Sequence, residues 1–512
     1  MSALSTKGIW KVIIASSVGT LIEAYDFLIF GSLAVVISTK FFPEENPNAA
    51  FLSTLATFAI GFIVRPFGAF FFGRLGDLIG RKYTFQLTLL LMGGSTFLLG
   101  CIPGYESIGF MAPLLVVVLR ILQGLAFGGE YGGAATYVAE HSPMGQRGYW
   151  TSWIQVMGTF GLCISLMVVF LTRNVLTPNQ FEDWGWRVPF WLSILMVVVS
   201  YTIRKKMNES PVYAKAKAEG KISANPLKES LGNKYNLKFI LLALFGAVMG
   251  QGVIWHTGQI YAMSFIKTVM LVNSSQADSI LVIALLFGTP FILFFGWLSD
   301  KVGRKTVMML GMLSAILLYR PIYRLMYETT DVSLKTEITD KAKLTAITKE
   351  NSQQQLDSIY TSTKEYEDGT KWTQIKTVPL FKGQPVLADK GVAKLDPKVT
   401  VIINDKDKWI LIFLVFIQVI FVAMVYGPIA AFLVEMFPVK IRYTSMSVPY
   451  HIGNGFFGGL LPAISTYFET NAKDGGDPEF YLEGLWYPIL IAGVSFIIGM
   501  VYLKRKNNIE NE

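Results

Sequence analysis

Long apolar runs separated by short polar turns organise the whole chain. Six runs precede a polar segment in the middle of the chain and six follow it. Each run is long enough to cross the roughly 30 Å apolar core of a membrane as an α-helix, and none shows the alternation of a transmembrane β-barrel. The pattern predicts an all-α polytopic membrane protein with twelve transmembrane helices in two six-helix halves, at residues 12–38, 51–75, 83–102, 113–139, 149–172, 186–203, 238–269, 277–299, 306–327, 409–437, 444–468 and 485–503.

A ten-residue phrase with the pattern G-x-x-x-D-x-x-G-R-K occurs once in each half, at residues 73–82 and 296–305. Duplication of a helical unit is typical of secondary transporters. The glycines permit a tight turn, the aspartates can cap a neighbouring helix N-terminus, and the arginines can pair with acidic groups. We expect a gating latch formed by Gly73, Asp77, Gly80, Arg81, Asp300, Gly303 and Arg304. The alternative is a positively charged anchor that only fixes topology.

Composition agrees with a membrane-embedded chain. Of the 512 residues, 52% are hydrophobic and only 16% are charged, and the mean hydropathy is +0.45, whereas soluble domains expose more charge. The two cysteines, Cys101 and Cys163, lie in apolar runs, where we expect them to be buried rather than paired. The chain divides into an N-terminal half, a middle loop, helices 7–9, an insert, helices 10–12 and a tail, at residues 1–203, 204–237, 238–327, 328–408, 409–503 and 504–512.

Lysine and arginine are unevenly distributed between the two sides of the predicted bundle. The side of the termini carries most of them, including Lys7, Lys11, Arg74, Arg81, Lys82, Arg147, Arg204, Lys205, Lys206, Lys301, Arg304, Lys305, Lys440 and Arg442. The opposite short loops offer only Lys40, Arg173, Lys267 and Lys473. The positive-inside rule then predicts that both termini lie in the cytoplasm. We expect a multi-pass protein of the inner (cytoplasmic) membrane. The net charge of +9 is explained by topology, so we expect no nucleic-acid partner.

One polar, lysine-rich segment breaks the pattern of short loops. Residues 328–408 lie between the ninth and tenth runs, on the side opposite the termini, and long loops are exempt from the charge rule. The stretch Thr339–Lys364 is expected to be helical or disordered, and Trp372–Asn404 contains short β-like runs. The simplest interpretation is a small extracytoplasmic cap without chemistry. A lid or a partner-docking module is the alternative.

Ionisable residues occur inside the apolar runs, where each costs about 2.5–3.5 kcal/mol unless it faces a cavity. Glu23 and Asp26 are three residues apart in the first run, and Arg120, Gln123 and Glu130 form a polar stripe in the fourth. Arg65 lies inside the second run, directly before Pro66. A buried carboxyl group near an arginine can exchange a proton at usable pH, which a proton-coupled carrier requires. The alternative is a charge pair, with Asp26 and Arg120 as plausible partners, that only holds helices together.

Polar and aromatic residues also interrupt the seventh and eleventh runs. Trp255, His256 and Gln259 are candidates for a substrate cavity because tryptophan can cover a cation and an amide can bind a carboxylate. Tyr450 and Asn454 are further candidates in the eleventh run. A histidine beside glycines is more often a packing or hydrogen-bonding residue, so His256 is open to both interpretations.

Several motifs together resemble the metabolite:H+ symporter family of the major facilitator superfamily. The twin phrase resembles the superfamily's loop motif, and Glu23-Ala24-Tyr25-Asp26-Phe27 resembles the family's E-W-Y-D-F, which adds Tyr25 to the candidates. Further matches are Arg120-Ile121-Leu122-Gln123-Gly124, Gly128-Gly129-Glu130-Tyr131-Gly132-Gly133-Ala134, Trp184-Gly185-Trp186-Arg187-Val188-Pro189-Phe190, Glu209-Ser210-Pro211 and Glu435-Met436-Phe437-Pro438. Ala24 replaces the family's tryptophan and Leu78 a usual arginine. Members of the family carry proline and betaine, shikimate, 2-oxoglutarate, citrate and related solutes.

The resemblance implies a secondary active transporter that couples protons to uptake of a small carboxylate-bearing metabolite, either an organic acid or a zwitterionic osmolyte, by alternating access. An uncoupled facilitator and a membrane sensor on a transporter fold are the alternatives. No Walker A loop, zinc-ligand spacing or nucleophile elbow occurs in the sequence, so we expect no enzyme activity, no cofactor and no metal. The expected partners are a solute, a proton and membrane lipids, with a monomeric chain. The sequence does not determine which solute is carried, or whether the coupling ion is H+ or Na+.

Overall fold

A computed structural model describes residues 6–42, 47–205, 209–350, 356–381, 384–385 and 398–503. The predicted tail, residues 504–512, lies outside the described residues. The same is true of residues 206–208 in the predicted middle loop and of residues 351–355, 382–383 and 386–397 in the predicted insert.

The N-terminal half is a bundle of long helices, several of which are interrupted. The second predicted span is broken before Pro66, because proline cannot donate a backbone hydrogen bond inside a helix. The helices are α1 (Thr6–Ser32), α2 (Ala34–Phe41), α3 (Pro47–Ile63), α4 (Arg65–Ile79), α5 (Arg81–Leu99), α6 (Tyr105–Ile108), α7 (Met111–His141), α8 (Arg147–Val175), α9 (Pro178–Asp183) and α10 (Val188–Lys205).

The C-terminal half repeats this arrangement after two short helices, α11 (Pro211–Ala218) and α12 (Pro226–Gly232). Its seventh and eleventh spans each contain wider π-helical turns, at Leu244–Val248, Thr257–Tyr261 and Gly453–Gly458. The remaining elements are α13 (Lys234–Ala243), α14 (Met249–His256), α15 (Ala262–Thr268), α16 (Ser274–Val302), α17 (Arg304–Thr330), α18 (Asp405–Met436), α19 (Arg442–Ile452), α20 (Leu461–Asp474), α21 (Phe480–Glu483) and α22 (Trp486–Tyr502).

Ten of the described helical segments are long and apolar enough to cross a membrane. The third and eleventh predicted spans are not among these ten, although α5 and the run α19 to α20 are helical. Both contain many hydroxyl groups, such as Thr84, Thr88 and Thr96 in α5, which lower their hydropathy without breaking the helix. The prediction of an all-α membrane protein built from two six-helix halves is confirmed by the fold comparison reported below.

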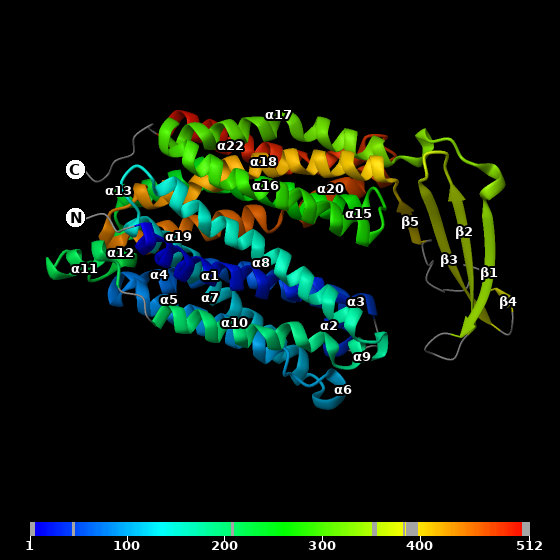
Figure 1. Ribbon diagram of the computed structural model, residues 1–512, viewed down its shortest axis with the longest axis horizontal. Coiled ribbons are helices and arrows are strands. Elements are labelled where there is room, and N and C mark those ends of the chain that lie inside the picture. Colours follow the sequence, from blue (N-terminus) through cyan, green and yellow to red (C-terminus); the bar gives the residue numbers. More distant parts are fainter. Residues whose placement is uncertain are drawn as a thin grey trace.

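The bundle has two distinct ends (Figure 1). We call the end where α1 begins and α22 ends the terminal end, and the opposite end, beyond which a β-sheet projects, the sheet end. The largest apolar core runs through the C-terminal half and extends into α1, α5, α7 and α8 of the N-terminal half, and a smaller core lies around Trp186 and Phe190. Cys101, at the end of α5, is exposed, so the expectation that it is buried was wrong; Cys163 is half-buried.

The insert contains an antiparallel sheet. Its strands are β1 (Lys343–Glu350), β2 (Leu356–Glu365), β3 (Lys371–Phe381), β4 (Gln384–Pro385) and β5 (Lys398–Ile402), in the order β1-β2-β3-β4 with β5 also paired to β3. The expectation that Thr339–Lys364 is helical or disordered was wrong for residues 343–350 and 356–364, which lie in β1 and β2, whereas Thr339–Lys341 forms a short 3-10 helix. Pairs such as Ile347↔Ile359 show why: β-branched residues alternate along both strands and face each other across them. The β-like run at 398–402 is confirmed.

The insert is fixed to the C-terminal half at its root. Val401 N donates to Leu271 O at 2.7 Å, and Asn273 N donates to Val401 O at 2.8 Å. The amide of Gln276 bonds Ile403 O at 2.8 Å and Ile403 N at 2.9 Å. Lys335 pairs with Asp368 at 2.6 Å and also with Asp407 in the first turn of α18. The sheet is therefore tied to both the α15–α16 connection and the start of α18.

Candidate functional site

A narrow cavity in the N-terminal half brings together four charged residues from the middle of its transmembrane helices. It is lined by Glu23 and Asp26 of α1, Gly61 of α3, Arg65 of α4, Met92 of α5, and Arg120, Gln123, Gly124 and Phe127 of α7. The four charged side chains are all buried. The free volume is about 10 Å³, roughly room for one water molecule. A solute could enter only after side chains or helices had moved.

The two arginines of this cavity contact amide and aromatic groups. Arg120 Nη1 donates to Gln123 Oε1 at 2.8 Å, and the Arg120 guanidinium lies 4.2 Å from the centroid of the Phe30 ring. Gln123 Nε2 in turn donates to Thr96 Oγ1 at 2.5 Å. The carboxylate oxygens of Asp26 have no hydrogen-bond partner within the described part of the chain. Asp26 and Arg120 thus share one cavity, while Arg120 is held by the amide of Gln123.

Arg65 is a cavity residue that the sequence analysis did not select, although its position inside a run was noted. Its guanidinium lies 3.5 Å from the centroid of the Phe127 ring and 4.1 Å from that of Phe62. Cation–π contacts of this kind stabilise a buried arginine in place of water. The position of Arg65 inside an apolar run was the signal that it is buried. The sequence does not determine the rotation of the second helix, so it could not show that Arg65 faces the cavity.

Two other candidates of the N-terminal half do not line the cavity. The hydroxyl of Tyr25 donates to Pro189 O at 2.9 Å and so joins α1 to α10. Glu130 pairs with Arg204 of α10 and accepts from Thr88 Oγ1 at 2.8 Å. At about 100° and 1.5 Å per residue, Glu130 lies only about 20° around α7 from Gln123 but about 10 Å further along the helix axis. The predicted polar stripe therefore continues to Glu130, but only Arg120 and Gln123 lie at the depth of the cavity.

The candidates of the C-terminal half also lie outside the cavity lining. His256 Nδ1 bonds the backbone oxygen of Gly252 at 2.8 Å, with Trp255 beside it at 4.8 Å between ring centroids. Gln259 is buried on the next turn. Asn454 exchanges hydrogen bonds with Gln251 at 3.1 and 3.3 Å. The Gln251–Asn454 pair joins the seventh helix to the eleventh, whereas the hydrogen bond of His256 lies within the seventh.

A layer of aromatic rings lies between the two halves at this level. Tyr131 of α7 and Tyr450 of α19 stack face to face with centroids 3.6 Å apart. The Phe127 ring lies 6.1 Å from that of His451, and the Phe62 ring lies 6.4 Å from that of His256. Because Phe127 and Phe62 also cover Arg65, the layer separates the charged cavity from the polar groups of helices seven and eleven.

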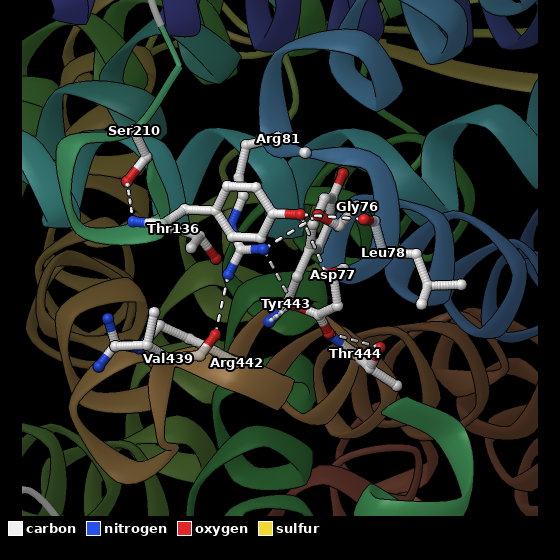
Figure 2. Close-up of polar contacts among 12 residues, drawn as sticks. Gly76, Asp77, Leu78, Arg81, Thr136, Ser210, Val439, Arg442, Tyr443 and Thr444 are labelled. Carbon is white, nitrogen blue, oxygen red and sulfur yellow. Dashed lines mark hydrogen bonds and ion pairs between the residues drawn. The ribbon is translucent and has the colours of Figure 1, made fainter. Parts of the chain in front are cut away.

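At the terminal end, the first copy of the repeated phrase joins the two halves (Figure 2). Asp77 accepts hydrogen bonds from Tyr443 N at 3.3 Å, Thr444 N at 3.0 Å and Thr444 Oγ1 at 2.8 Å, and so caps the start of α19. Arg81 pairs with Asp77 at 3.1 Å and lies 3.8 Å from Glu140. The expected capping and charge pairing are present, and the capped helix belongs to the opposite half.

The second copy makes the reciprocal contact. Asp300 accepts from Gly148 N and Tyr149 N, both at 2.9 Å, and so caps the start of α8. Arg304 pairs with Asp300 at 2.6 Å and with Glu435 at 3.1 Å. Each half thus caps a helix of the other half, and the terminal end is closed by both contacts.

The glycines of the phrase have two separate roles. Gly80 and Gly303 adopt φ angles of 120° and 99°, which favour glycine. Gly73 allows close approach of the facing helix, because an added Cβ atom would lie 3.0 Å from Thr444 Cα. Gly296 does the same, since its Cβ atom would lie 2.6 Å from Ser152 Oγ.

Sequence reasoning missed three acidic partners of the latch. Glu140 pairs with Arg442 at 3.2 Å, and Glu435 occupies the matching place in the other half. Glu209 accepts from the backbone N–H groups of Arg81 and Lys82 at 3.2 and 3.3 Å and so caps α5. The recurrence of Glu-x-x-Pro at Glu140 and Glu435 was the signal that could have identified the first two.

Comparison with known proteins agrees with this architecture. Residues 11–229 match the family model "Sugar (and other) transporter". The chain is 30% identical over 477 residues to the inner membrane metabolite transport protein YhjE of Escherichia coli K12, covering 90% of this chain and 88% of that protein. It is 33% identical over 323 residues to the proline/betaine transporter of the same organism, covering 61% of this chain and 64% of that protein.

Among solved structures, the fold resembles the proton:xylose symporter XylE of the major facilitator superfamily, bound to 6-bromo-6-deoxy-D-glucose. The TM-score is 0.70 at 16% identity, with 98% of this chain and 97% of that chain covered. At this identity the likeness shows the fold alone. Together with the extensive match to a metabolite transporter, it shows that the chain is a membrane transporter that binds a small solute. The chain belongs to the metabolite:H+ symporter family of the major facilitator superfamily.

Proposed function

We propose that this protein couples proton entry to the uptake of a small carboxylate-bearing metabolite, either an organic acid or a zwitterion such as proline or betaine. The observation that carries the proposal is the buried cavity where Glu23 and Asp26 face Arg65 and Arg120. Carboxyl groups supply a proton site, and a guanidinium can bind a carboxylate with two parallel hydrogen bonds. Relatives named proline/betaine transporter and glycine betaine/proline/ectoine/pipecolic acid transporter support a carboxylate-bearing solute.

We further propose that the terminal end faces the cytoplasm and the sheet end faces the exterior. The lysine and arginine distribution supports this orientation. Closure of the terminal end by the latch then corresponds to a state whose next step is opening inward. A single chain supplies the cavity and both copies of the latch, so we expect the monomer to be sufficient for transport.

Transport by purified protein in right-side-out proteoliposomes tests the coupling. With an acidic exterior, the solute should accumulate inside, and an uncoupler should abolish that accumulation. Asp26→Asn should remove accumulation and leave exchange of pre-loaded solute in place, because exchange needs no net proton movement. Accumulation by wild type that is insensitive to the uncoupler, without another ion gradient, would refute proton coupling and favour a different ion. Equilibration without accumulation would favour an uncoupled facilitator.

A membrane sensor on this fold is the remaining alternative, and the insert supports it. A sensor would bind a solute without moving it. Binding by thermal shift, combined with no flux in either direction in the proteoliposomes, would favour the sensor.

A further inference from the structure

A buried ion pair lies beside the cavity without lining it. Arg204, in the last turn of α10, pairs with Glu130 of α7, and both side chains are buried. Arg204 Nη1 also donates to Phe85 O at 2.7 Å, and Thr88 Oγ1 donates to Glu130 Oε2 at 2.8 Å. Both carboxylate oxygens of Glu130 therefore have donors, as an ionised carboxylate inside a bundle requires.

The pair occupies a notch in α1 that exists because residue 19 is glycine. A methyl group on Gly19 would collide with the Arg204 guanidinium and with Glu130. Glu23 follows Gly19 by one helical turn on the same face, and side chains of a helix lean toward its N-terminus. Glu23 therefore leans toward the notch, and its Oε2 atom has no hydrogen-bond partner among the residues that the structure describes.

Glu23 thus lies between two groups of charge. On one side it shares the cavity with Asp26 and Arg120. Electrostatic interactions also link Glu23 to titratable groups on α4, α7, α10, α18 and α19. These groups are Arg65, Glu130, Tyr131, Arg204, Tyr426 and Tyr450. In the notch, Arg204 pairs with Glu130 and also interacts electrostatically with Glu23.

We propose that Arg204 is a positioning residue that moves between Glu130 and Glu23 and thereby passes a proton from the cavity to Glu130. Before the step, Glu23 carries the proton and Arg204 pairs with the Glu130 carboxylate. The proton then moves from a Glu23 oxygen to a Glu130 oxygen, and Arg204 pairs with the Glu23 carboxylate. One arginine and one carboxylate are charged before and after, so the step leaves no uncompensated charge in the bundle. This inference rests on the proposed proton coupling.

Gly19→Ala tests the notch without removing a charge. The added methyl group should displace the Arg204 guanidinium, lower gradient-driven accumulation at least tenfold, and leave solute exchange within twofold of wild type. Gly94→Ala in α5 is the matched control, because a Cβ atom there would meet nothing within 4 Å. Normal accumulation by Gly19→Ala would overturn the proposal.

A double variant separates proton transfer from mere structural support, and it decides the matter if Gly19→Ala fails to fold. Glu130→Gln with Arg204→Met removes both charges of the pair, a replacement that buried ion pairs often tolerate. We expect a folded protein that exchanges solute but does not accumulate it. Accumulation equal to that of wild type would show that the pair is only a structural tie and would overturn the proposal.

A readout independent of transport keeps this inference distinct from the proposed function. In infrared difference spectra of purified protein, the band of the Glu23 carboxylic acid is identified as the one that Glu23→Gln removes. The pH at which this band titrates should differ by at least one unit between wild type and Gly19→Ala. An unchanged titration in Gly19→Ala refutes the role of Arg204 even if wild type is proton-coupled. A shifted titration supports it even if the coupling ion proves to be another.

Discussion

Two carboxyl groups and two guanidinium groups share an interior space of about 10 Å³. Their types and their depth in the helices could be predicted from the sequence, because charges inside apolar runs are costly and conspicuous. Which of these charged groups share one cavity could not be predicted. The cavity includes Arg65 and excludes Glu130, and this outcome depends on how α4 is rotated against α1 and on how deep in the bundle each turn of α7 lies. A few tens of degrees of helix rotation, set by packing, decide which side chain faces the cavity.

Substitution of Arg120 tests the predicted solute class. Arg120→Lys should weaken binding of a carboxylate solute about tenfold or more, because a point charge loses the planar, two-pronged donor geometry of the guanidinium. Binding can be measured by isothermal titration calorimetry on purified protein. Arg173→Lys, at an exposed arginine near the end of α8, should have no effect. Unchanged affinity in Arg120→Lys, or a confirmed substrate that is purely cationic, would contradict the prediction.

At the scale of helices and turns, the repeated phrase was the most predictable part of the molecule. The aspartates at positions 77 and 300 were expected to cap helices, and they do. The identity of the capped helices was not predictable, because α8 and α19 begin with ordinary residues and their distance from the phrase in sequence is large. Capping across the two halves is a property of the fold rather than of the local sequence.

Removal of a cap should shift the balance between conformations. Asp77→Ala removes three hydrogen bonds to α19 and an ion pair with Arg81, and loss of a cap alone costs about 0.5–2 kcal/mol. We expect the terminal end to open and uptake to slow at least fivefold, with little loss of folded protein. Initial uptake rates measure the effect, and thiol accessibility at the terminal end measures the opening.

The two copies of the latch provide their own comparison. Asp300→Ala should slow uptake in the same way, since Asp300 caps α8 as Asp77 caps α19. Asp183→Ala, at an exposed aspartate of α9, should leave uptake unchanged. Wild-type rates in both latch variants would mean that the phrase only anchors topology.

At the scale of the whole molecule, the insert consists of a root and a distal hairpin. The root contains Lys335 and Val401, which bond the helical bundle, whereas β1 and β2 lie far from it (Figure 1). The ends of the hairpin are adjacent, because Ile338 N donates to Glu365 O at 2.9 Å. Deletion of residues 339–364, with two glycines joining the ends, should leave uptake within twofold of wild type.

Deletion of the entire segment 335–400 is the informative comparison. It also removes Lys335, so the start of α18 loses an ion pair with Asp407. We expect insertion and most transport to persist, with lower thermal stability than in the hairpin deletion. Loss of all uptake in the shorter deletion, at normal expression, would show that the hairpin acts as a lid.

Thiol labelling tests the topology of the whole chain. Cysteine at Ser358 in β2, in a Cys101→Ser background, should react with an impermeant reagent added to intact cells. Cysteine at Lys217 in α11 should react only after lysis, because α11 lies at the terminal end (Figure 1). The reverse pattern would contradict the predicted orientation.

The insert root should withstand the external acidity that the proposed proton coupling requires. Burial raises the pKa of Asp368, but hydrogen bonds from Lys335 and Thr370 outweigh it and hold that pKa below its usual range. The stabilisation from this carboxylate is present above the unfolded value of about 3.9 and is lost as the pH falls below it. Burial lowers the pKa of Lys335, but its hydrogen bonds to Asp368 and Asp407 raise it overall, so its contribution is lost only at strongly alkaline pH. The protection factors of the insert's amides, which are exchange rates corrected for their intrinsic pH dependence, should therefore be constant from about pH 5 to 9 and fall below about pH 4.

The sheet has a practical consequence for visualising this carrier. Particle images of a 57.0 kDa chain built from two similar halves are difficult to align in electron microscopy, because the detergent around the bundle hides its shape. The insert places a folded mass beyond one end of the bundle (Figure 1). Particle images could be oriented by this mass alone, without an antibody fragment, so inward-open and outward-open molecules could be sorted within a single sample.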